Sequence, residues 1–265
     1  MSGDAQTPIT PQDSLGHPRH SWGPGEVALG WIAAQLVGVA AFGAVVALGF
    51  SLIAPQRPGG FLGRAVGQNR DGGEFVDDAL PLAWQMLLQV PGWIVMLGVA
   101  WVFAGVAGKA RPGWNIAGEP LDVVRGIVAG FLLQIPIVGI VVWLQSLVVG
   151  ESESFRAQAL VDSIDGPLDL VVLILIVAVG APLVEELFYR GILQRSLVDR
   201  FGPVIGIGIA SLVFGAVHFS WAELLPLTVV GAGFGILAHR YGRLLPAIIA
   251  HMMFNSMVLI ILLVL

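Results

Sequence analysis

The chain contains no cysteine, and it has few charged residues of either sign. The absence of cysteine excludes disulfides, thiol nucleophiles and cysteine-based zinc sites together. Charged residues make up 12% of the 265 residues, whereas hydrophobic residues make up 56%, and the mean hydropathy is +0.86. Such a chain is too apolar for a soluble globular domain. The net charge is −5, and the lysines and arginines form no basic patch, so we expect no nucleic-acid partner.

Long apolar runs make up much of the chain. A membrane-spanning helix needs roughly 20 apolar residues, because the hydrocarbon core is about 30 Å thick. Seven stretches are candidate spans: Val27 to Ala54, Leu82 to Ala107, Val123 to Val149, Leu168 to Phe188, Val204 to Phe219, Leu224 to Ala238 and Leu244 to Leu265. The fifth and sixth are short, so one of them could be broken or tilted, and an eighth span could lie within the longer runs. The sequence predicts an all-α, polytopic transmembrane bundle with seven to eight spanning helices.

Polar segments divide the chain into four parts. Residues 1–25 form a polar tail, and residues 26–150 form an N-terminal membrane region of three spans, with an extramembrane loop at Pro55 to Asp78. The first apolar run is too long for the core of a signal peptide, so we expect it to remain as an anchor. Residues 151–167 are a polar loop. Residues 168–265 form the membrane region that carries nearly every buried polar candidate.

The first polar cluster within an apolar run contains Glu185, Glu186 and Arg190. A charge in hydrocarbon costs about 2.5 to 3.5 kcal/mol on insertion scales, so an ionisable residue there is a functional candidate. Glu186 and Arg190 are four residues apart on one helix face and could form an ion pair, whereas Glu185 points elsewhere. The alternative is that the helix meets the headgroup layer here, with Arg190, Arg195 and Arg200 extending to the interface.

Two further clusters follow on later apolar helices. Phe214 and His218 lie four residues apart, as do His251 and Asn255. The alternatives are a structural histidine at His218 and polar residues that join membrane helices at His251 and Asn255.

A turn at Phe201-Gly202-Pro203 would bring two of these clusters together. Glu185 lies seventeen residues before Gly202 and His218 sixteen residues after it, so an antiparallel hairpin places them at the same level. His251 lies only about eight residues past the turn at Tyr241 to Arg243. Tilt or a broken sixth helix must make up that difference.

These clusters, in this order, resemble the CPBP family of CAAX proteases and bacteriocin-processing enzymes, also called the Abi family. The signature reads Glu-Glu-x-x-x-Arg at 185–190, Phe-x-x-x-His at 214–218 and His-x-x-x-Asn at 251–255, without departure at any motif position. The resemblance covers roughly Leu168 to Leu265. It implies an intramembrane endopeptidase, which in the best-understood members of the family removes the last three residues of prenylated proteins.

The resemblance also implies roles for the motif residues. Carried over by position, Glu185 and His218 activate the hydrolytic water, and His251 and Asn255 stabilise the oxyanion. Glu186, Arg190 and Phe214 are then supporting residues. These residue types suit the reaction, because a carboxylate in an apolar site is a competent general base and donors aimed at an oxyanion supply a large catalytic contribution.

The family is usually described as metalloproteases, and a zinc ion could take Glu185, His218 and His251 as ligands. That arrangement leaves no separate carboxylate as general base except Glu186, which Arg190 should already engage. We therefore favour a glutamate-type peptidase without a metal cofactor, with Zn²⁺ as the alternative. Neither the His-Glu-x-x-His helix of zinc peptidases nor the Gly-x-Ser-x-Gly motif of serine hydrolases is present.

Two other classes of function remain open. One is a non-catalytic membrane protein, such as an immunity protein or a scaffold. The other is a proton-coupled transporter, which the absence of matched Gly/Pro-broken helices in the two halves disfavours. For a peptidase the expected partners are the lipid bilayer and a peptide or membrane-protein substrate, lipidated or not. The composition is compatible with the cytoplasmic membrane of a bacterium, where a bacterial membrane peptide is a more fitting substrate than a prenylated protein.

The distribution of positive charge predicts the orientation. With seven spans, the lysines and arginines divide nine to four in favour of the side that holds the N-terminus, which predicts a cytoplasmic N-terminus. Reporter fusions in the tail at residues 1–25 and at Gly118 should both report a cytoplasmic location. An external signal from either fusion contradicts the seven-span topology.

Overall fold

A computed structural model describes residues 82–87, 89–106, 114–149 and 160–264, together with Gly23, Gly25, Glu26, Leu29, Gly30 and Ile32. Apart from those six residues, the predicted tail and the predicted first span, Val27 to Ala54, lie outside the described residues. The predicted loop at Pro55 to Asp78 also lies outside them, as does the predicted loop at 151–167 up to residue 159.

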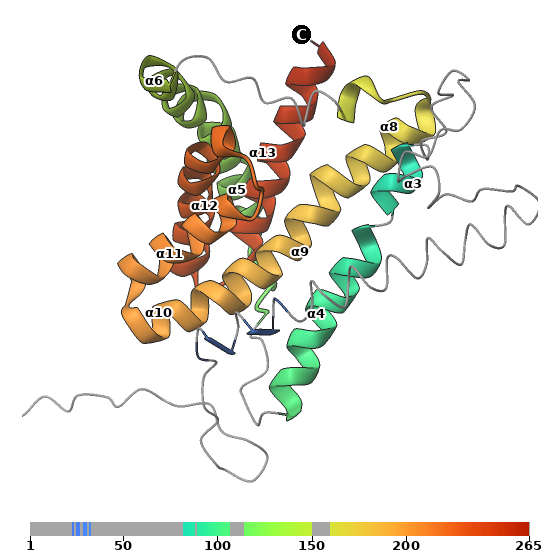
Figure 1. Cartoon of the computed structure of the whole chain (residues 1–265). Coiled ribbons are helices and arrows are strands. Elements are labelled where there is room, and N and C mark those ends of the chain that lie inside the picture. The colour runs from blue at the N-terminus through green and yellow to red at the C-terminus, as the bar shows by residue number, and fades with distance from the viewer. Residues whose placement is uncertain are drawn as a thin grey trace, which may run out of the picture.

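The described elements are α3 (Leu82–Leu87), α4 (Gln89–Val106), α5 (Pro120–Leu132), η1 (Leu133–Val138), α6 (Gly139–Val149), α8 (Pro167–Leu173), η2 (Ile174–Gly180), α9 (Ala181–Phe188), η3 (Tyr189–Gln194), α10 (Arg195–Phe201), α11 (Pro203–Ala216), α12 (Trp221–Tyr241) and α13 (Leu245–Val264). The η elements are π-helical turns within longer helices. The described part of the chain contains no strand, so the predicted all-α bundle is confirmed (Figure 1).

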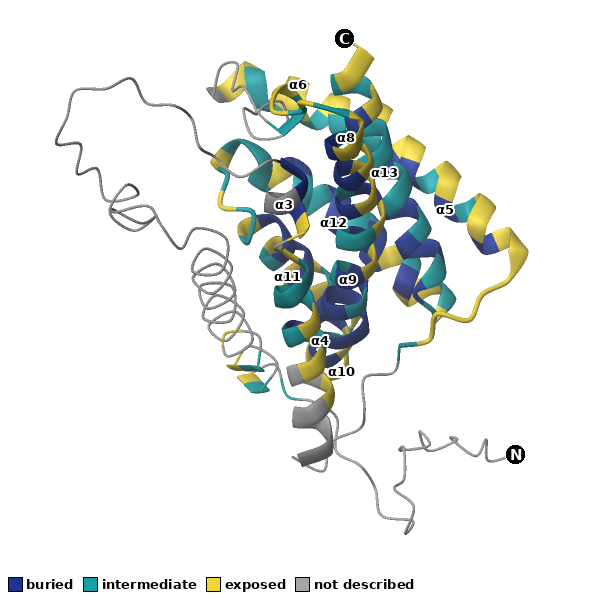
Figure 2. Ribbon diagram, turned by 90° about the vertical axis from the view of Figure 1, so that its right-hand side faces the viewer, coloured by how far each residue is buried: buried dark blue, intermediate teal, exposed yellow. Residues whose placement is uncertain are grey.

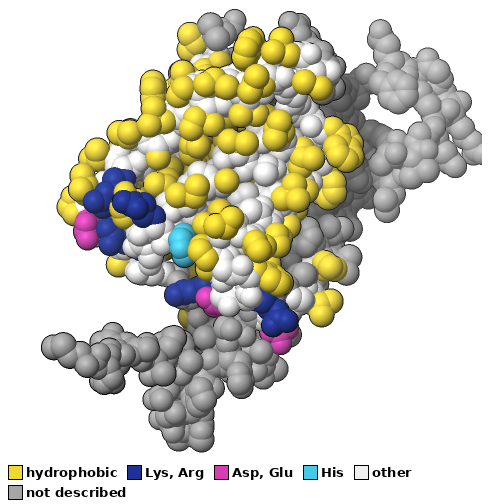
Figure 3. Space-filling model, turned by 90° about the vertical axis from the view of Figure 1, so that its left-hand side faces the viewer, with side chains coloured by type: hydrophobic (Ala, Val, Ile, Leu, Met, Phe, Trp, Pro, Cys, Tyr) yellow, Lys and Arg dark blue, Asp and Glu magenta, His cyan; other side chains and the backbone are white. Residues whose placement is uncertain are grey.

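Four helices of the described residues are long and apolar enough to cross a membrane. They span Pro120–Val148, Pro167–Phe201, Trp221–Tyr241 and Leu245–Val264, and the apolar helix α11 is shorter. On the face drawn in Figure 3, hydrophobic side chains are spread over the described surface, and basic side chains gather at its left edge and its lower edge. Figure 2 shows buried residues along α9 and α12 and many exposed ones along α5. These features are those of a bundle surrounded by lipid.

The helix from Pro167 to Phe201 corrects the predicted fourth span, which ended at Phe188. The polar residues after Phe188 do not all face outward, because Arg190 and Gln194 are buried. The helix ends at the predicted turn, where Gly202 has a φ of +80° and Pro203 begins α11. At about 1.5 Å per residue, its 35 residues exceed the thickness of the hydrocarbon core, so it either tilts or extends beyond that core.

Figure 1 shows this long helix crossing α13 obliquely. The sixth predicted span is α12, one continuous helix of 21 residues despite Pro226 near its start. Tilt of the long helix, and not a broken sixth helix, therefore brings the predicted site residues to a common level.

Small residues let α5 pack closely against α13. A Cβ atom added at Gly126 would lie 2.5 Å from Ile249 Cβ, and one added at Gly130 would lie 2.7 Å from Met253 Cβ and overlap the carbonyl oxygen of Ala250. Such Gly-x-x-x-Gly faces are typical of closely packed membrane helices. Buried Asp122 at the start of α5 forms ion pairs with Arg125 and with Arg243, which precedes α13. The helix α5 is thus held at the level of the α12–α13 turn.

We predict that Gly130→Ala destabilises the folded protein relative to Gly139→Ala. Both substitutions gain the same helix propensity, but a Cβ atom at Gly139 meets nothing within 4 Å. Overpacking at a helix contact costs about 1 to 3 kcal/mol. Thermal unfolding in detergent should show a lower Tm for Gly130→Ala than for Gly139→Ala, and equal Tm values would contradict the close α5–α13 contact.

Candidate active site

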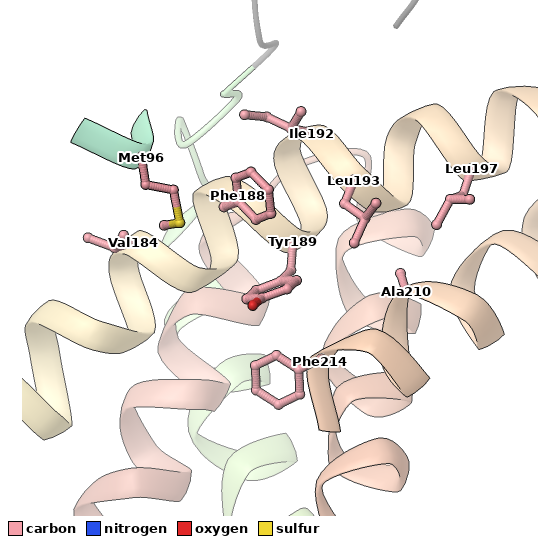
Figure 4. Packing of buried hydrophobic residues seen from close by; sticks show 9 residues of the cluster. All are labelled: Met96, Val184, Phe188, Tyr189, Ile192, Leu193, Leu197, Ala210 and Phe214. Carbon is pink, nitrogen blue, oxygen red and sulfur yellow. The ribbon is translucent and has the colours of Figure 1, made fainter. Parts of the chain in front are cut away.

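The hairpin of η3–α10 and α11 has the register that the sequence predicts. Tyr189 lies thirteen residues before Gly202 and Phe214 twelve residues after it, and their rings pack edge to face with centroids 5.3 Å apart (Figure 4). Phe214 belongs to the buried cluster of α4, α9, η3, α10 and α11 that Figure 4 draws. The predicted pairing of Glu185 with His218 at one level lies one turn further from Gly202, beyond the end of α11 at Ala216, and stays a prediction.

Glu186 is the most deeply buried charged residue of the site, with 0% of its surface exposed. Its Oε2 atom lies 3.3 Å from Arg190 Nε, which is the ion pair predicted from the i, i+4 spacing. Its Oε1 atom lies 3.0 Å from Nδ1 of His251 on α13. A buried carboxylate needs such partners because desolvation strongly disfavours a lone charge. Glu186 thus joins α9, η3 and α13.

Arg190 extends this network to α11 and α12. Its Nη2 atom donates a hydrogen bond of 2.9 Å to the carbonyl oxygen of Gly231, and its guanidinium lies 4.6 Å from the centroid of the Phe214 ring. A planar guanidinium suits this combination of hydrogen bonding and stacking on an aromatic ring. Arg190 is therefore an interior residue, and the alternative that it extends to the membrane interface is wrong.

His251 lies between the two glutamates. Because a carboxylate can only accept, the Nδ1–H group of His251 donates to Glu186, and Nε2 is left to face Glu185. Nε2 lies 3.9 Å from Glu185 Oε2, which is too long for a hydrogen bond. The ring is held on one side by Phe234 of α12, at a centroid distance of 4.6 Å. Glu185 itself is more accessible than Glu186, with 25% of its side chain exposed.

His218 follows the end of α11 and contacts the same aromatic ring as His251. Its Nδ1 atom lies 2.8 Å from the carbonyl oxygen of Phe214, and the His218 and Phe214 ring centroids are 5.2 Å apart. The centroid of the His251 ring lies 5.7 Å from that of Phe214. Phe214 therefore contacts both histidines. The pairing of His218 with Glu185 on one water stays a prediction.

Asn255 is anchored by the backbone of another helix. Its side-chain amide donates a hydrogen bond of 2.8 Å to the carbonyl oxygen of Val177 in η2. Because the amide lies one turn beyond His251 on α13, both predicted oxyanion donors are carried by the same face of one helix.

The zinc set predicted as an alternative is not assembled as a group. In the described parts of the chain, no three His, Asp or Glu side chains lie together as a metal could require. His251 already directs one ring nitrogen to Glu186. The choice between a metal-free and a zinc-dependent peptidase stays a prediction.

Sequence reasoning missed Gln194, Phe234 and Gly231. Gln194 is buried and donates a hydrogen bond of 2.9 Å to the carbonyl oxygen of Gly235, parallel to the bond from Arg190 to Gly231. Gln194 follows Arg190 by four residues, and Gly235 follows Gly231 by four residues. This shared spacing was a signal that could have identified the second bond, from Gln194 to Gly235. No comparable signal marks Phe234.

Parts of the chain are similar to known membrane peptidases. Residues 167–257 match a family model described as "Type II CAAX prenyl endopeptidase Rce1-like". The chain is also 31% identical over 134 residues to a protein of Bacillus subtilis (strain 168) described as "Putative membrane peptidase YdiL". That match covers 50% of this chain and 54% of the relative, so the chain spans about half the length of the curated relative that it matches. No solved structure matches the chain.

The matched region contains all three motifs, from Glu185 to Asn255, and the helices that hold them together. Residues 167–257 are thus similar to a family of CAAX prenyl endopeptidases, and half of the chain is similar to a protein described as a membrane peptidase.

Proposed function

We propose that the protein is an intramembrane endopeptidase that hydrolyses a peptide bond in or near the bilayer, with Glu185 as the general base. The observation that carries this proposal is the position of Glu185 opposite Nε2 of His251. Their separation of 3.9 Å exceeds hydrogen-bond range, yet one oxygen atom bonded to both groups fits between them. A water molecule can supply that oxygen, because it can donate a hydrogen bond to the Glu185 carboxylate and accept one from Nε2 of His251.

In the proposed reaction, the Glu185 carboxylate removes a proton from a water molecule that His218 helps to hold. The water oxygen then forms a bond to the scissile carbonyl carbon, and the carbonyl electrons move to its oxygen. His251, from Nε2, and Asn255, from its amide, donate to that oxyanion. Collapse of the intermediate breaks the C–N bond, and the proton held by Glu185 passes to the leaving amine.

The Glu186–Arg190 pair supports this proposal as a scaffold for His251. With its Nδ1–H group bound to Glu186, the His251 ring presents Nε2 toward Glu185. For Nε2 to donate to the oxyanion as well, the His251 ring must carry protons on both nitrogens. The aromatic rings of Phe214 and Phe234 hold the ring from the sides and limit the access of water. Fixed donors in a water-poor site stabilise developing charge more strongly than donors in water.

The proposed substrate class is a peptide or protein held at the membrane, with or without a lipid group. The matching family model is described as a CAAX prenyl endopeptidase, whereas the composition of this chain is compatible with a bacterial membrane and a bacterial membrane peptide. Comparing protein termini in cells that express the wild-type protein and in cells that express Glu185→Gln would identify the substrate. Termini that appear only with the wild-type protein would name it.

We predict that Glu185→Gln and His218→Ala each lower turnover by roughly 10²-fold to 10⁴-fold, because each removes a group that acts on the water. The assay uses purified protein in liposomes with three quenched fluorescent probes. One ends in a farnesylated Cys-a-a-X sequence, the second is the same peptide without the farnesyl group, and the third is a single-span membrane peptide.

The matched control is Asp199→Asn, which removes an exposed carboxylate at the far end of the same long helix. It should leave cleavage unchanged. Normal cleavage by Glu185→Gln would contradict the proposed base. Failure of the wild-type protein to cleave any of the three probes or any cellular protein would contradict the peptidase function.

We also predict that turnover does not need a bound metal ion, because a metal bound by Glu185, His218 and His251 would leave the reaction without a free base. Metal analysis of purified active protein should find less than one zinc ion per chain. Exhaustive chelation should leave the cleavage rate unchanged. Loss of activity on chelation, with recovery when zinc is added back, would instead assign these three residues as ligands.

A further inference from the structure

The carbonyl that holds Asn255 is one that a proline leaves without a backbone partner. In η2, the N–H group of Ala181 bonds to the carbonyl oxygen of Ile176, five residues earlier. In the same register, the next residue would bond to Val177. That residue is Pro182, which has no N–H group. Within a bilayer no water replaces the missing donor, so the Val177 carbonyl requires one from another helix.

Asn255 supplies that donor from α13. A backbone carbonyl only accepts, so the atom of Asn255 that lies 2.8 Å from the Val177 oxygen is the amide nitrogen. This nitrogen carries two hydrogens, and the second makes no hydrogen bond within the described residues. Pro182 is fully buried and lies three residues before Glu185, on the same turn of α9.

The same arrangement occurs a second time, away from the candidate catalytic residues. Pro226 lies inside α12 and removes the donor for the carbonyl of Ala222, four residues earlier. The side-chain amide of Gln145 on α6 donates to that carbonyl over 3.1 Å. In both cases an amide from a neighbouring helix satisfies a carbonyl that a proline has released. The second case provides an internal comparison, because it joins helices without any candidate catalytic residue.

We propose that Pro182 and the Val177 carbonyl position the Asn255 amide for the reaction. This inference rests on the proposed function of Asn255 as an oxyanion donor. One amide hydrogen is fixed on Val177, which fixes the plane of the amide and directs the second hydrogen about 120° away from the first. Pro182 is thus a positioning residue, because an N–H group at position 182 would compete with Asn255 for the carbonyl.

The test is a double-mutant cycle on kcat with the probe that the wild-type protein cleaves best among the three described above. Asn255→Ala should lower kcat roughly 10²-fold to 10³-fold, as the loss of one oxyanion donor does. Pro182→Ala restores the N–H group and should lower kcat roughly 10-fold to 10²-fold with little change in KM, because the amide is misaligned and not removed. The double variant should be no slower than Asn255→Ala alone.

Two controls separate positioning from general stability. Pro182→Val also restores the N–H group but fills most of the space of the proline ring, so it should match Pro182→Ala if the N–H group is the cause and not a cavity. It also replaces Pro182→Ala if that variant does not fold. Gln145→Ala removes the corresponding amide at Ala222 and should lower the Tm without changing kcat.

The outcomes distinguish this inference from the proposed function. Normal kcat in Asn255→Ala would overturn the oxyanion role of Asn255, and the positioning role would fall with it. A low kcat in Asn255→Ala, together with normal kcat in both folded Pro182 variants, would overturn the positioning role alone. Losses that multiply in the double variant would also overturn it, because Pro182 would then act independently of Asn255.

Discussion

The buried carboxylate of Glu186 constrains the arrangement of the surrounding helices. It has no exposed surface, and its two oxygens face Arg190 and His251. Arg190 in turn bonds to a carbonyl of α12 and stacks on the Phe214 ring of α11. Because an unpaired charge in this interior is very unfavourable, displacement of any one of these helices would leave part of the network without a partner. The position of His251, and therefore the geometry opposite Glu185, depends on this network.

The backbone presents a second constraint of the same kind. Prolines within α9 and α12 release carbonyl groups that lipid cannot satisfy, and amides of Asn255 and Gln145 bind them from other helices. The π-helical turns η2 and η3 lie on either side of Glu185 and Glu186, and they carry Val177, Arg190 and the glutamine that binds Gly235. Irregular helix turns of this kind are frequent at functional sites because they redirect side chains and free backbone groups.

Helix length and tilt bring these groups together. The 35-residue helix crosses α13 obliquely, and this course lets Glu186 meet His251 although His251 lies only nine residues past Gly242. The close contact of α5 with α13 supports the opposite side of the helix that carries His251. The described part of the third predicted span therefore contributes to the same bundle as the motif-bearing helices.

The sequence by itself determined the relations that lie within one helix or one tight turn. Apolar length determined an all-helical membrane protein, the spacing of Glu186 and Arg190 determined their ion pair, and Gly202-Pro203 determined the hairpin register. Helix geometry is regular over a few residues, so such relations can be read from spacing alone. Only the tertiary structure decided that Arg190 is interior, that His251 bonds to Glu186, and that Asn255 binds the carbonyl released by Pro182. These contacts join residues up to 78 positions apart, and they depend on helix tilt and side-chain direction, which spacing along the chain does not specify.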